Sequence, residues 1–181
     1  EEAVQEQGCR ALWSLASNED LEVKVANAGG IEAVVEGMKK HPGSAGVQEL
    51  GCEVLTRLAL DDDNNQLKIE SAGGIEAVVE GMRQHPGEEA VQEQGCRALW
   101  SLASNEDLEV KVANAGGIEA VVEGMKKHPG SAGVQELGCE VLTRLALDDD
   151  NNQLKIESAG GIEAVVEGMR QHPGEEAVQE Q

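Results

Sequence analysis

The sequence predicts an all-α solenoid, a stack of helical repeats, and three observations support this prediction. A segment reading Gly-Gly-Ile-Glu-Ala-Val-Val-Glu-Gly-Met, two polar residues and His-Pro-Gly occurs four times, beginning at Gly29, Gly73, Gly116 and Gly160, at intervals of 44, 43 and 44 residues. A fixed period of this length is typical of solenoids. Within each copy the apolar residues recur at i, i+3, i+4 and i+7, which form one face of an amphipathic helix. The 181 residues include no Phe, no Tyr and only two Trp, so the core must consist of closely packed aliphatic side chains.

Three helices are predicted before the first His-Pro-Gly turn at residues 41–43. Residues 1–16 form the first, and its buried side should comprise Val4, Ala11, Leu12 and Leu15. The polar residues 17–20 resemble a helix cap, and a short helix that buries Val23 and Val25 should follow them as far as residue 27. The glycine pair at 29–30 permits a tight turn, after which the repeated segment forms a helix from Gly30 to about His41.

The elements after this helix follow the same order. Pro42 and Gly43 stop it, and a long helix is expected over residues 44–59. A short helix containing Leu67 and Ile69 comes next, and the repeated segment returns as a helix over 74–85. One glycine recurs inside each long helix, where a neighbouring helix is expected to pass too close for a side chain; these glycines are Gly8, Gly51, Gly95 and Gly138.

The repeat is perfect at twice this period. Residues 88–174 reproduce residues 1–87 without one substitution, and residues 175–181 reproduce residues 1–7. The unit is therefore an 87-residue pair of non-identical modules, and the predicted division of the single solenoid is 1–16 (partial), 17–59, 60–103, 104–146 and 147–181 (incomplete). Recent duplication, deliberate design or one consensus unit laid down periodically would each produce such identity.

The order of elements resembles the armadillo repeat, which has three helices in about forty residues. The matching segments are 21–27, 29–42 and 44–59, and then 66–71, 73–86 and 88–103, so the resemblance covers essentially the whole chain. It implies a right-handed superhelical α-solenoid of armadillo-like three-helix repeats, whose third helices line a groove that binds extended peptides. Members that hold nuclear-import signals use a Trp and an Asn one turn later. Trp13 and Trp100 match the Trp, whereas Ser17 and Ser104 occupy the Asn position.

The net charge and the composition indicate which classes of partner, and which cellular compartment, to expect for this chain. The net charge is −21, and the acidic residues are spread evenly, with 16 acidic against 7 basic residues in each 87-residue unit. Such a chain repels phosphate backbones and anionic lipid, so we expect neither nucleic acid nor membrane as a partner. No apolar run approaches the ~20 residues that span a bilayer. The four cysteines are interpreted as buried free thiols, which weakly favours a reducing, cytoplasmic-type compartment.

The exposed side of each long helix is the best candidate contact surface. Glu6, Arg10, Trp13 and Ser17 fall at i, i+4, i+7 and i+11, and an exposed Trp beside an Arg is typical of a binding anchor. The competing interpretation is that Trp13 packs between neighbouring long helices as core. The predicted partner-contact residues are Glu6, Arg10, Trp13, Glu49, Glu53, Thr56, Arg97, Trp100, Glu140 and Thr143.

Other motifs give only weak evidence for a metal, phosphate or catalytic site. Asp61, Asp63 and Asn65 have the opening spacing of a calcium loop but lack its later Gly and Glu, so a helix cap is the favoured interpretation. The histidine before each Pro-Gly lies at a helix C-terminus, where it could meet terminal carbonyl groups. The glycine pairs lack a phosphate-loop pattern, and no nucleophile stands beside a base. The sequence therefore predicts no catalytic site and no metal or other cofactor.

The function expected first is structural. Glu1 begins directly in a long helix and residue 181 stops within the next one, so neither end has the polar cap that solenoids need. We expect the chain to be a window of a longer array, or to associate end to end into a filament. The alternative is an interaction module that binds a basic extended peptide in an acidic groove.

Overall fold

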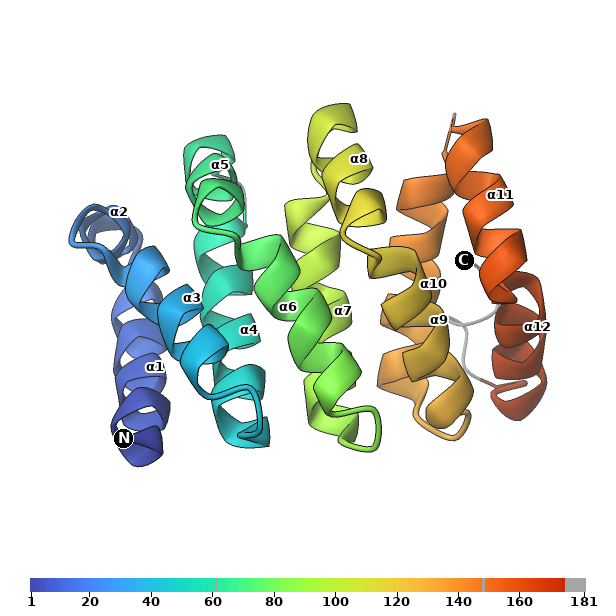
Figure 1. The fold of residues 1–181 in the computed structure, drawn as a ribbon, viewed down its shortest axis with the longest axis horizontal. Helices are drawn as coiled ribbons and strands as arrows, with labels where there is room; N and C mark the ends of the chain where they lie inside the picture. Colours follow the sequence, from blue (N-terminus) through green and yellow to red (C-terminus); the bar gives the residue numbers. More distant parts are fainter. Residues whose placement is uncertain (61, 148, 175–181) are drawn as a thin grey trace.

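The structure, a computed structural model, describes residues 1–60, 62–147 and 149–174. These residues form twelve α-helices and no strand (Figure 1). In chain order the helices are α1 Glu2–Ala16, α2 Glu19–Asn27, α3 Gly30–Lys40, α4 Ala45–Ala59, α5 Asp63–Ser71, α6 Gly74–Gln84, α7 Glu89–Leu102, α8 Glu106–Asn114, α9 Gly117–Lys127, α10 Ala132–Ala146, α11 Asp150–Ala159 and α12 Gly161–Gln171.

The local sequence explains where these helices begin and end. Asn18 caps α2 by accepting a hydrogen bond from Leu21 N, and Ser44 caps α4 by accepting one from Val47 N. Gly29 has a φ of 86°, in the left-handed region, so it turns the chain sharply between α2 and α3 at a position where other residues would be strained. The left-handed glycine recurs before each second helix, and α5, α8, α10 and α11 also have a side-chain cap, whereas α7 has none at Glu88.

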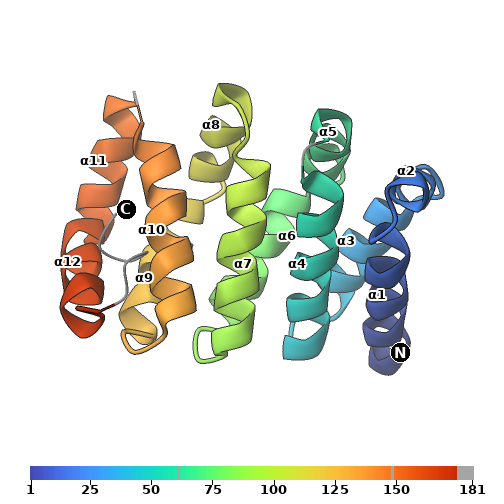
Figure 2. The same cartoon turned by 180° about the vertical axis from the view of Figure 1, so that it is seen from behind.

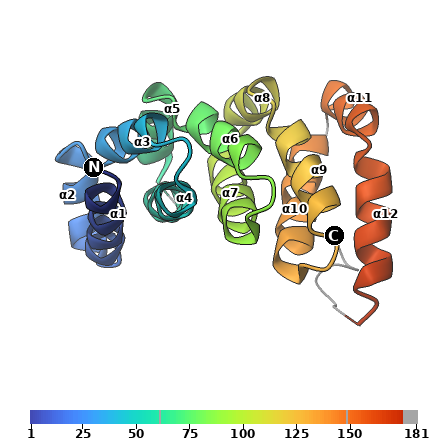
Figure 3. The same ribbon diagram turned by 60° about the horizontal axis from the view of Figure 1, so that its bottom comes forward.

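Three layers of helices run along the stack. The third helices α1, α4, α7 and α10 lie side by side on one face, which Figure 2 shows from the front, and the second helices α3, α6, α9 and α12 cover the other face. The short first helices α2, α5, α8 and α11 cross one edge, and Figure 3 shows that this order is kept along the chain. Together the layers form the predicted right-handed, superhelical all-α solenoid.

The core lies between the second and third helices. In α3 the predicted apolar face is buried in full, since Ile31, Val34, Val35 and Met38 are all buried. The internal long helices contribute leucines, valines and alanines to the same continuous cluster. A core of small aliphatic side chains suits helices that pack about 8–10 Å apart.

A neighbouring helix passes close to the glycines inside the long helices, as predicted, at three of the four positions, and the side chain that it brings there is a methionine. A Cβ at Gly95 would lie 2.5 Å from Met82 Cγ, and Gly51 and Gly138 are in the same position against the methionines of α3 and α9. These glycines therefore let the second helix approach the third. Gly8 differs, because a Cβ there would meet nothing within 4 Å.

The predicted burial of the first helix is wrong for most of its residues. Val4 is 63% exposed and Leu15 47% exposed, Ala11 is exposed, and Leu12 is only half-buried. The identical internal helix α7 buries the equivalent side chains completely, with Val91 1% exposed. The pattern therefore identified the correct face, but in α1 no preceding repeat of the described chain covers it.

The predicted burial of Val23 is also wrong. Val23 is 51% exposed, whereas Val25 is buried as predicted. Residues two positions apart in a helix point about 200° apart, so only one of them can face the core. Leu67 occupies the equivalent position in α5 and is equally exposed, while Ile69 is buried.

Candidate functional site

The predicted contact residues form a stripe along the third helices. We call this surface the third-helix stripe; its predicted members lie on α1 (Glu6, Arg10, Trp13), α4 (Glu49, Glu53, Thr56), α7 (Arg97, Trp100) and α10 (Glu140, Thr143). All ten side chains are exposed or half-buried. Because α4 packs against both α1 and α7, and α7 against α10, the stripe is continuous across the stack.

The two tryptophans of the stripe lie in different environments. Trp100 is half-buried and packs against the core cluster, and the guanidinium group of Arg144 lies 4.3 Å from the centre of its ring. Trp13 is 45% exposed. Trp100 therefore combines the two interpretations of this position, since one part of the ring belongs to the core and the rest faces the stripe.

Trp100 also separates two surface grooves. One, of about 640 Å³, is polar and includes Leu60, Asp62 and Ser104 in its wall. The other, of about 410 Å³, runs along the stripe past Arg97 and Glu140. Trp100 therefore lines both grooves.

Glutamates of the stripe are held in a site that disfavours their charge. Burial, followed by the neighbouring Glu49, raises the pKa of the Glu53 carboxyl, and Arg10 and Arg97 only partly oppose this rise. Glu140 repeats the pattern with Glu136 as its acidic neighbour. The stripe therefore has acidic pairs whose repulsion is not fully neutralised within the chain.

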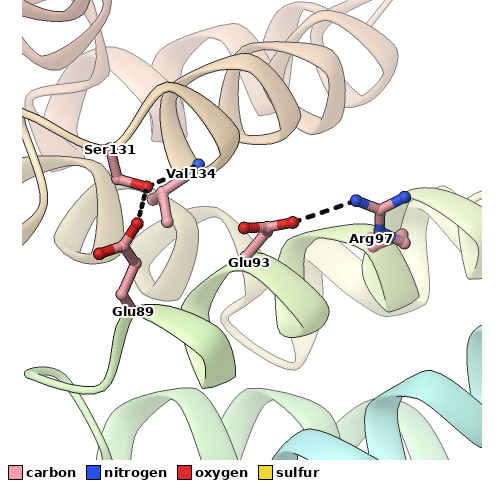
Figure 4. A network of polar contacts seen from close by, with 5 residues as sticks. All are labelled: Glu89, Glu93, Arg97, Ser131 and Val134. Carbon is pink, nitrogen blue, oxygen red and sulfur yellow. Dashed lines mark hydrogen bonds and ion pairs between the residues drawn. The ribbon is translucent and has the colours of Figure 1, made fainter.

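The edge of the stripe near the helix starts is organised by serines and glutamates (Figure 4). Ser131 Oγ donates a hydrogen bond to Glu89 Oε1 at 2.6 Å and accepts one from Val134 N, so one hydroxyl caps α10 and connects it to α7. On the next turn of α7, Glu93 forms an ion pair with Arg97 at 3.2 Å. Ser44 and Glu2 make the same contact between α4 and α1.

Arginines that the sequence reasoning missed connect successive third helices. Arg144 donates hydrogen bonds to the carbonyl oxygens of Trp100 and Ala103 at the C-terminal end of α7. Arg57 does the same for the end of α1. A basic residue in the last turn of a long helix indicates a hydrogen bond to terminal carbonyl groups, but from sequence alone these would be expected to be the carbonyl groups of its own helix.

The histidines contact carbonyl groups, although in the neighbouring repeat. His85 Nε2 lies 2.7 Å from Pro42 O, and His128 Nε2 lies 2.9 Å from Pro86 O. Because a carbonyl oxygen only accepts, the ring nitrogen is the donor in each contact. The histidines therefore join the turns of successive repeats.

A buried glutamine pairs carbonyl groups at the C-terminal end of three second helices, α3, α6 and α9. Gln92 Nε2 donates to Met82 O at 2.8 Å and to His85 O at 2.9 Å, and Gln48 and Gln135 repeat both hydrogen bonds. These are terminal carbonyl groups that the helix itself cannot pair. The sequence reasoning did not identify this role.

The prediction of buried free thiols is confirmed. All four cysteines are free and buried. Burial raises the pKa of Cys52 and Cys96 to about 12 and the pKa of Cys9 and Cys139 to about 11. The thiolate that reacts with electrophiles or metals is therefore strongly disfavoured.

The segment with the calcium-like spacing holds a helix cap, although the capping side chain is that of the intervening Asp62 and not of Asp61, Asp63 or Asn65. Asp62 accepts a hydrogen bond from Asn65 N at 2.9 Å at the start of α5, and Asp149 does the same for Asn152. Asp61 and its counterpart Asp148, which belong to the same motif, lie outside the described residues. Within the described ranges, no group of three His, Cys, Asp or Glu side chains could hold a metal ion.

None of the helices in the described part of the chain is both long and apolar enough to span a membrane. This finding concerns membrane-spanning helices alone.

Comparisons with known proteins agree with this geometry. Two crystal structures of engineered proteins from the Northeast Structural Genomics Consortium are similar: one is 26% identical and has a TM-score of 0.85, with 99% of this chain and 72% of that chain covered. The other is 25% identical and has a TM-score of 0.83, with 99% and 70% covered. No curated protein matches significantly. The family described as LRRK2 ARM repeat matches residues 1–181, and the chain therefore belongs to the armadillo repeat family.

Proposed function

We propose that this chain is a non-enzymatic structural scaffold, a solenoid that extends by adding repeats end to end. The observation that supports the proposal is the difference between identical residues at the ends and in the middle of the stack. Ile75 of α6 is 1% exposed, whereas its counterpart Ile162 of α12 is 57% exposed, and Val4 differs from Val91 in the same way at the opposite end. Val4 and Ile162 therefore lie on faces that neighbouring helices cover at the internal positions.

The apolar surface at each end is continuous. Beside α1, a shallow groove of about 410 Å³ is formed by Leu12, Leu15, Leu21 and Val25 together with the glycine pair at 29–30. At the opposite end Ile162 and Val166 line a groove of about 570 Å³ on α12. Exposed contiguous apolar patches of this kind favour association, because burying them removes apolar surface from water.

The test is the mass of the full chain as its concentration rises. We expect sedimentation equilibrium between about 1 µM and about 1 mM to show a steadily increasing average mass with no preferred small oligomer, because the two end faces differ and their contact does not close on itself. A strictly monomeric species over this whole range would contradict the proposal.

A second candidate function is the binding of a basic extended segment along the third-helix stripe. The observation that favours it is the arrangement of acidic side chains on the stripe, where burial and then the neighbouring Glu49 and Glu136 raise the pKa of Glu53 and Glu140, so that a cation beside them would stabilise the charged form. An exposed Trp edge between two grooves would supply the apolar part of such a contact.

Matched double variants test this second candidate, because each position occurs twice in the chain. We expect Glu53→Gln with Glu140→Gln, and separately Trp13→Ala with Trp100→Ala, each to weaken capture of a fluorescent Lys-rich extended peptide about tenfold at low salt. The control is Glu32→Gln with Glu119→Gln, which removes the same charge from the opposite face. Equal losses in all three variants, or no capture at low salt, would contradict this function.

A further inference from the structure

We propose that the row of first helices is a docking surface for a basic amphipathic helix that carries an apolar residue about every seven positions. We call this surface the first-helix edge; it consists of the exposed side chains of α2, α5, α8 and α11. These helices lie along one edge of the stack, apart from the third-helix stripe (Figure 1). The surface is thus separate from both functions proposed above.

Each first helix exposes one apolar side chain at its centre. Leu67 of α5 is 51% exposed and Val110 of α8 is 46% exposed. Both helices lie inside the stack with another first helix on either side, so their exposure does not arise from a missing neighbour (Figure 1). Val23 and Leu154 occupy the same position in α2 and α11 and are also exposed. The edge therefore presents an apolar ladder with one rung per repeat.

The two non-identical modules agree on this apolar position although they differ around it. Aligned residue by residue, α2 reads Glu-Asp-Leu-Glu-Val-Lys-Val-Ala-Asn and α5 reads Asp-Asn-Asn-Gln-Leu-Lys-Ile-Glu-Ser. Two positions are apolar in both helices: one holds Val25 and Ile69, which are buried, and the other holds Val23 and Leu67, which face solvent. Exposed apolar surface is unfavourable in water, so a solvent position without a role has no reason to remain apolar in both modules. The ladder is therefore a feature of the repeat.

Lysines of the first helices are used in contacts between repeats. Lys68 Nζ donates a hydrogen bond to Asn27 Oδ1 at 3.1 Å, which connects α5 to α2. Lys111 Nζ forms an ion pair with Glu70 Oε1 at 2.8 Å, which connects α8 to α5. The hydrogen bond recurs between α11 and α8. These contacts hold the four helices in one row, and they direct the positive charges sideways rather than outward.

Acidic side chains at the start of each first helix remain without a basic partner. Asp63, Glu106 and Asp107 are exposed, and none of them forms an ion pair with another described residue. They precede Leu67 and Val110 by three or four positions, and residues at this spacing are neighbours on the surface of a helix. Each interior rung of the ladder therefore lies beside carboxylates that the chain itself does not neutralise.

Charge and spacing together select the partner. A second copy on this edge would bring carboxylates against carboxylates, and the net charge of −21 opposes that approach. A helix with Lys or Arg beside an apolar stripe instead complements both the ladder and the carboxylates. Packed helices lie about 8–10 Å apart, and seven residues of an α-helix rise about 10.5 Å. One apolar residue per heptad therefore matches one rung per repeat, and a helix of about 22 residues would reach four rungs.

Fluorescence anisotropy with the full chain tests this surface. The probe is a labelled Lys-rich peptide of about 22 residues with one leucine about every seven positions, and its control has the same composition with the leucines scattered round the helix. We expect the patterned peptide to bind at least about tenfold more tightly than the scattered one. Leu67→Gln with Val110→Gln should remove this difference, because the ladder then loses its two interior rungs.

Matched charge variants separate this edge from the third-helix stripe. At low salt, Glu106→Gln with Asp107→Asn should weaken binding of the patterned peptide several-fold, whereas Glu53→Gln with Glu140→Gln removes the same charge from the stripe and should leave it unchanged. The opposite result would place the peptide on the stripe and overturn the proposal.

Two further measurements complete the test. Leu67→Gln with Val110→Gln should melt at the wild-type temperature, because both side chains already face water, so its loss of binding is not unfolding. Equal binding of the two peptides, or no binding of either, would overturn the proposal. So would a wild-type chain that forms dimers which this variant abolishes, because a second copy would then occupy the edge.

Discussion

The same substitution, made at two equivalent positions of the repeat, measures how much the stacking of repeats stabilises the fold. Leu102 is fully buried in α7, and its counterpart Leu15 in α1 is 47% exposed. The Leu→Ala substitution removes three carbon atoms, and at about 0.8 kcal/mol each the lost transfer free energy is about 2.4 kcal/mol for a buried side chain. A cavity adds to this, so we expect Leu102→Ala to lower the free energy of unfolding by about 2.5–5 kcal/mol.

The same substitution at Leu15 should cost much less. About half of that side chain already faces water, so the expected loss is about 1.2 kcal/mol, with no closed cavity to add to it. The assay is urea denaturation followed by circular dichroism, at a protein concentration low enough to keep the chain monomeric and analysed as a nearest-neighbour repeat array. Equal losses for the two variants would refute the reasoning, because the sequences around them are the same and only the stacking differs.

Three other predictions use the same internal controls. Gly8→Ala should stabilise the monomer by about 0.5–1 kcal/mol, because the new Cβ meets open space. Gly95→Ala should destabilise it by about 1–3 kcal/mol, because the new Cβ meets Met82. A lower melting temperature for Gly8→Ala than for Gly95→Ala would contradict this. The four thiols should react with a labelling reagent only as fast as the chain unfolds, and rapid labelling of the native chain would contradict their burial. Folding raises the pKa of Glu53 and Glu140, so their ionised form destabilises the folded state at pH 7. The double variant Glu53→Gln with Glu140→Gln should therefore have a higher melting temperature than the wild type at pH 7. This difference should shrink as the pH falls through the raised pKa towards the unfolded value of about 4.3. A constant difference across that pH range would contradict the assignment.

The sequence predicted the helices because their signals are local. The polar cap at Asn18, the left-handed Gly29 and the apolar face of α3 all act within a few residues of where they stand, and the structure has the helix boundaries within one or two residues of those predicted. The four cysteines, interpreted from the sequence as buried free thiols, are buried in the long helices. Repetition made these signals strong, since each was seen four times.

Contacts between repeats could not be read from the same pattern. The hydrogen bonds of Arg144 with α7 and of His128 with Pro86 join residues more than 40 positions apart. Their pairing depends on the rotation between neighbouring repeats, which a sequence period does not specify. The half-burial of Trp100 has the same origin, because the Arg144 side chain that covers its ring comes from the next repeat.

The wrong predictions have separate physical causes. Val23 and Val25 were both expected to be buried in one short helix, but residues two positions apart in a helix point to different sides. Val4 and Leu15 lie on the face that α7 buries, but burial there depends on a neighbour. The solenoid is therefore encoded by the repeat, and the environment of each residue by its position in the stack.

The most direct test of the central claim is a helical reconstruction by electron cryomicroscopy of the material formed at high concentration. The account predicts unbranched filaments in which the chain extends end to end as one superhelix. Closed rings, symmetric dimers, or filaments whose copies meet through the third-helix stripe would contradict it.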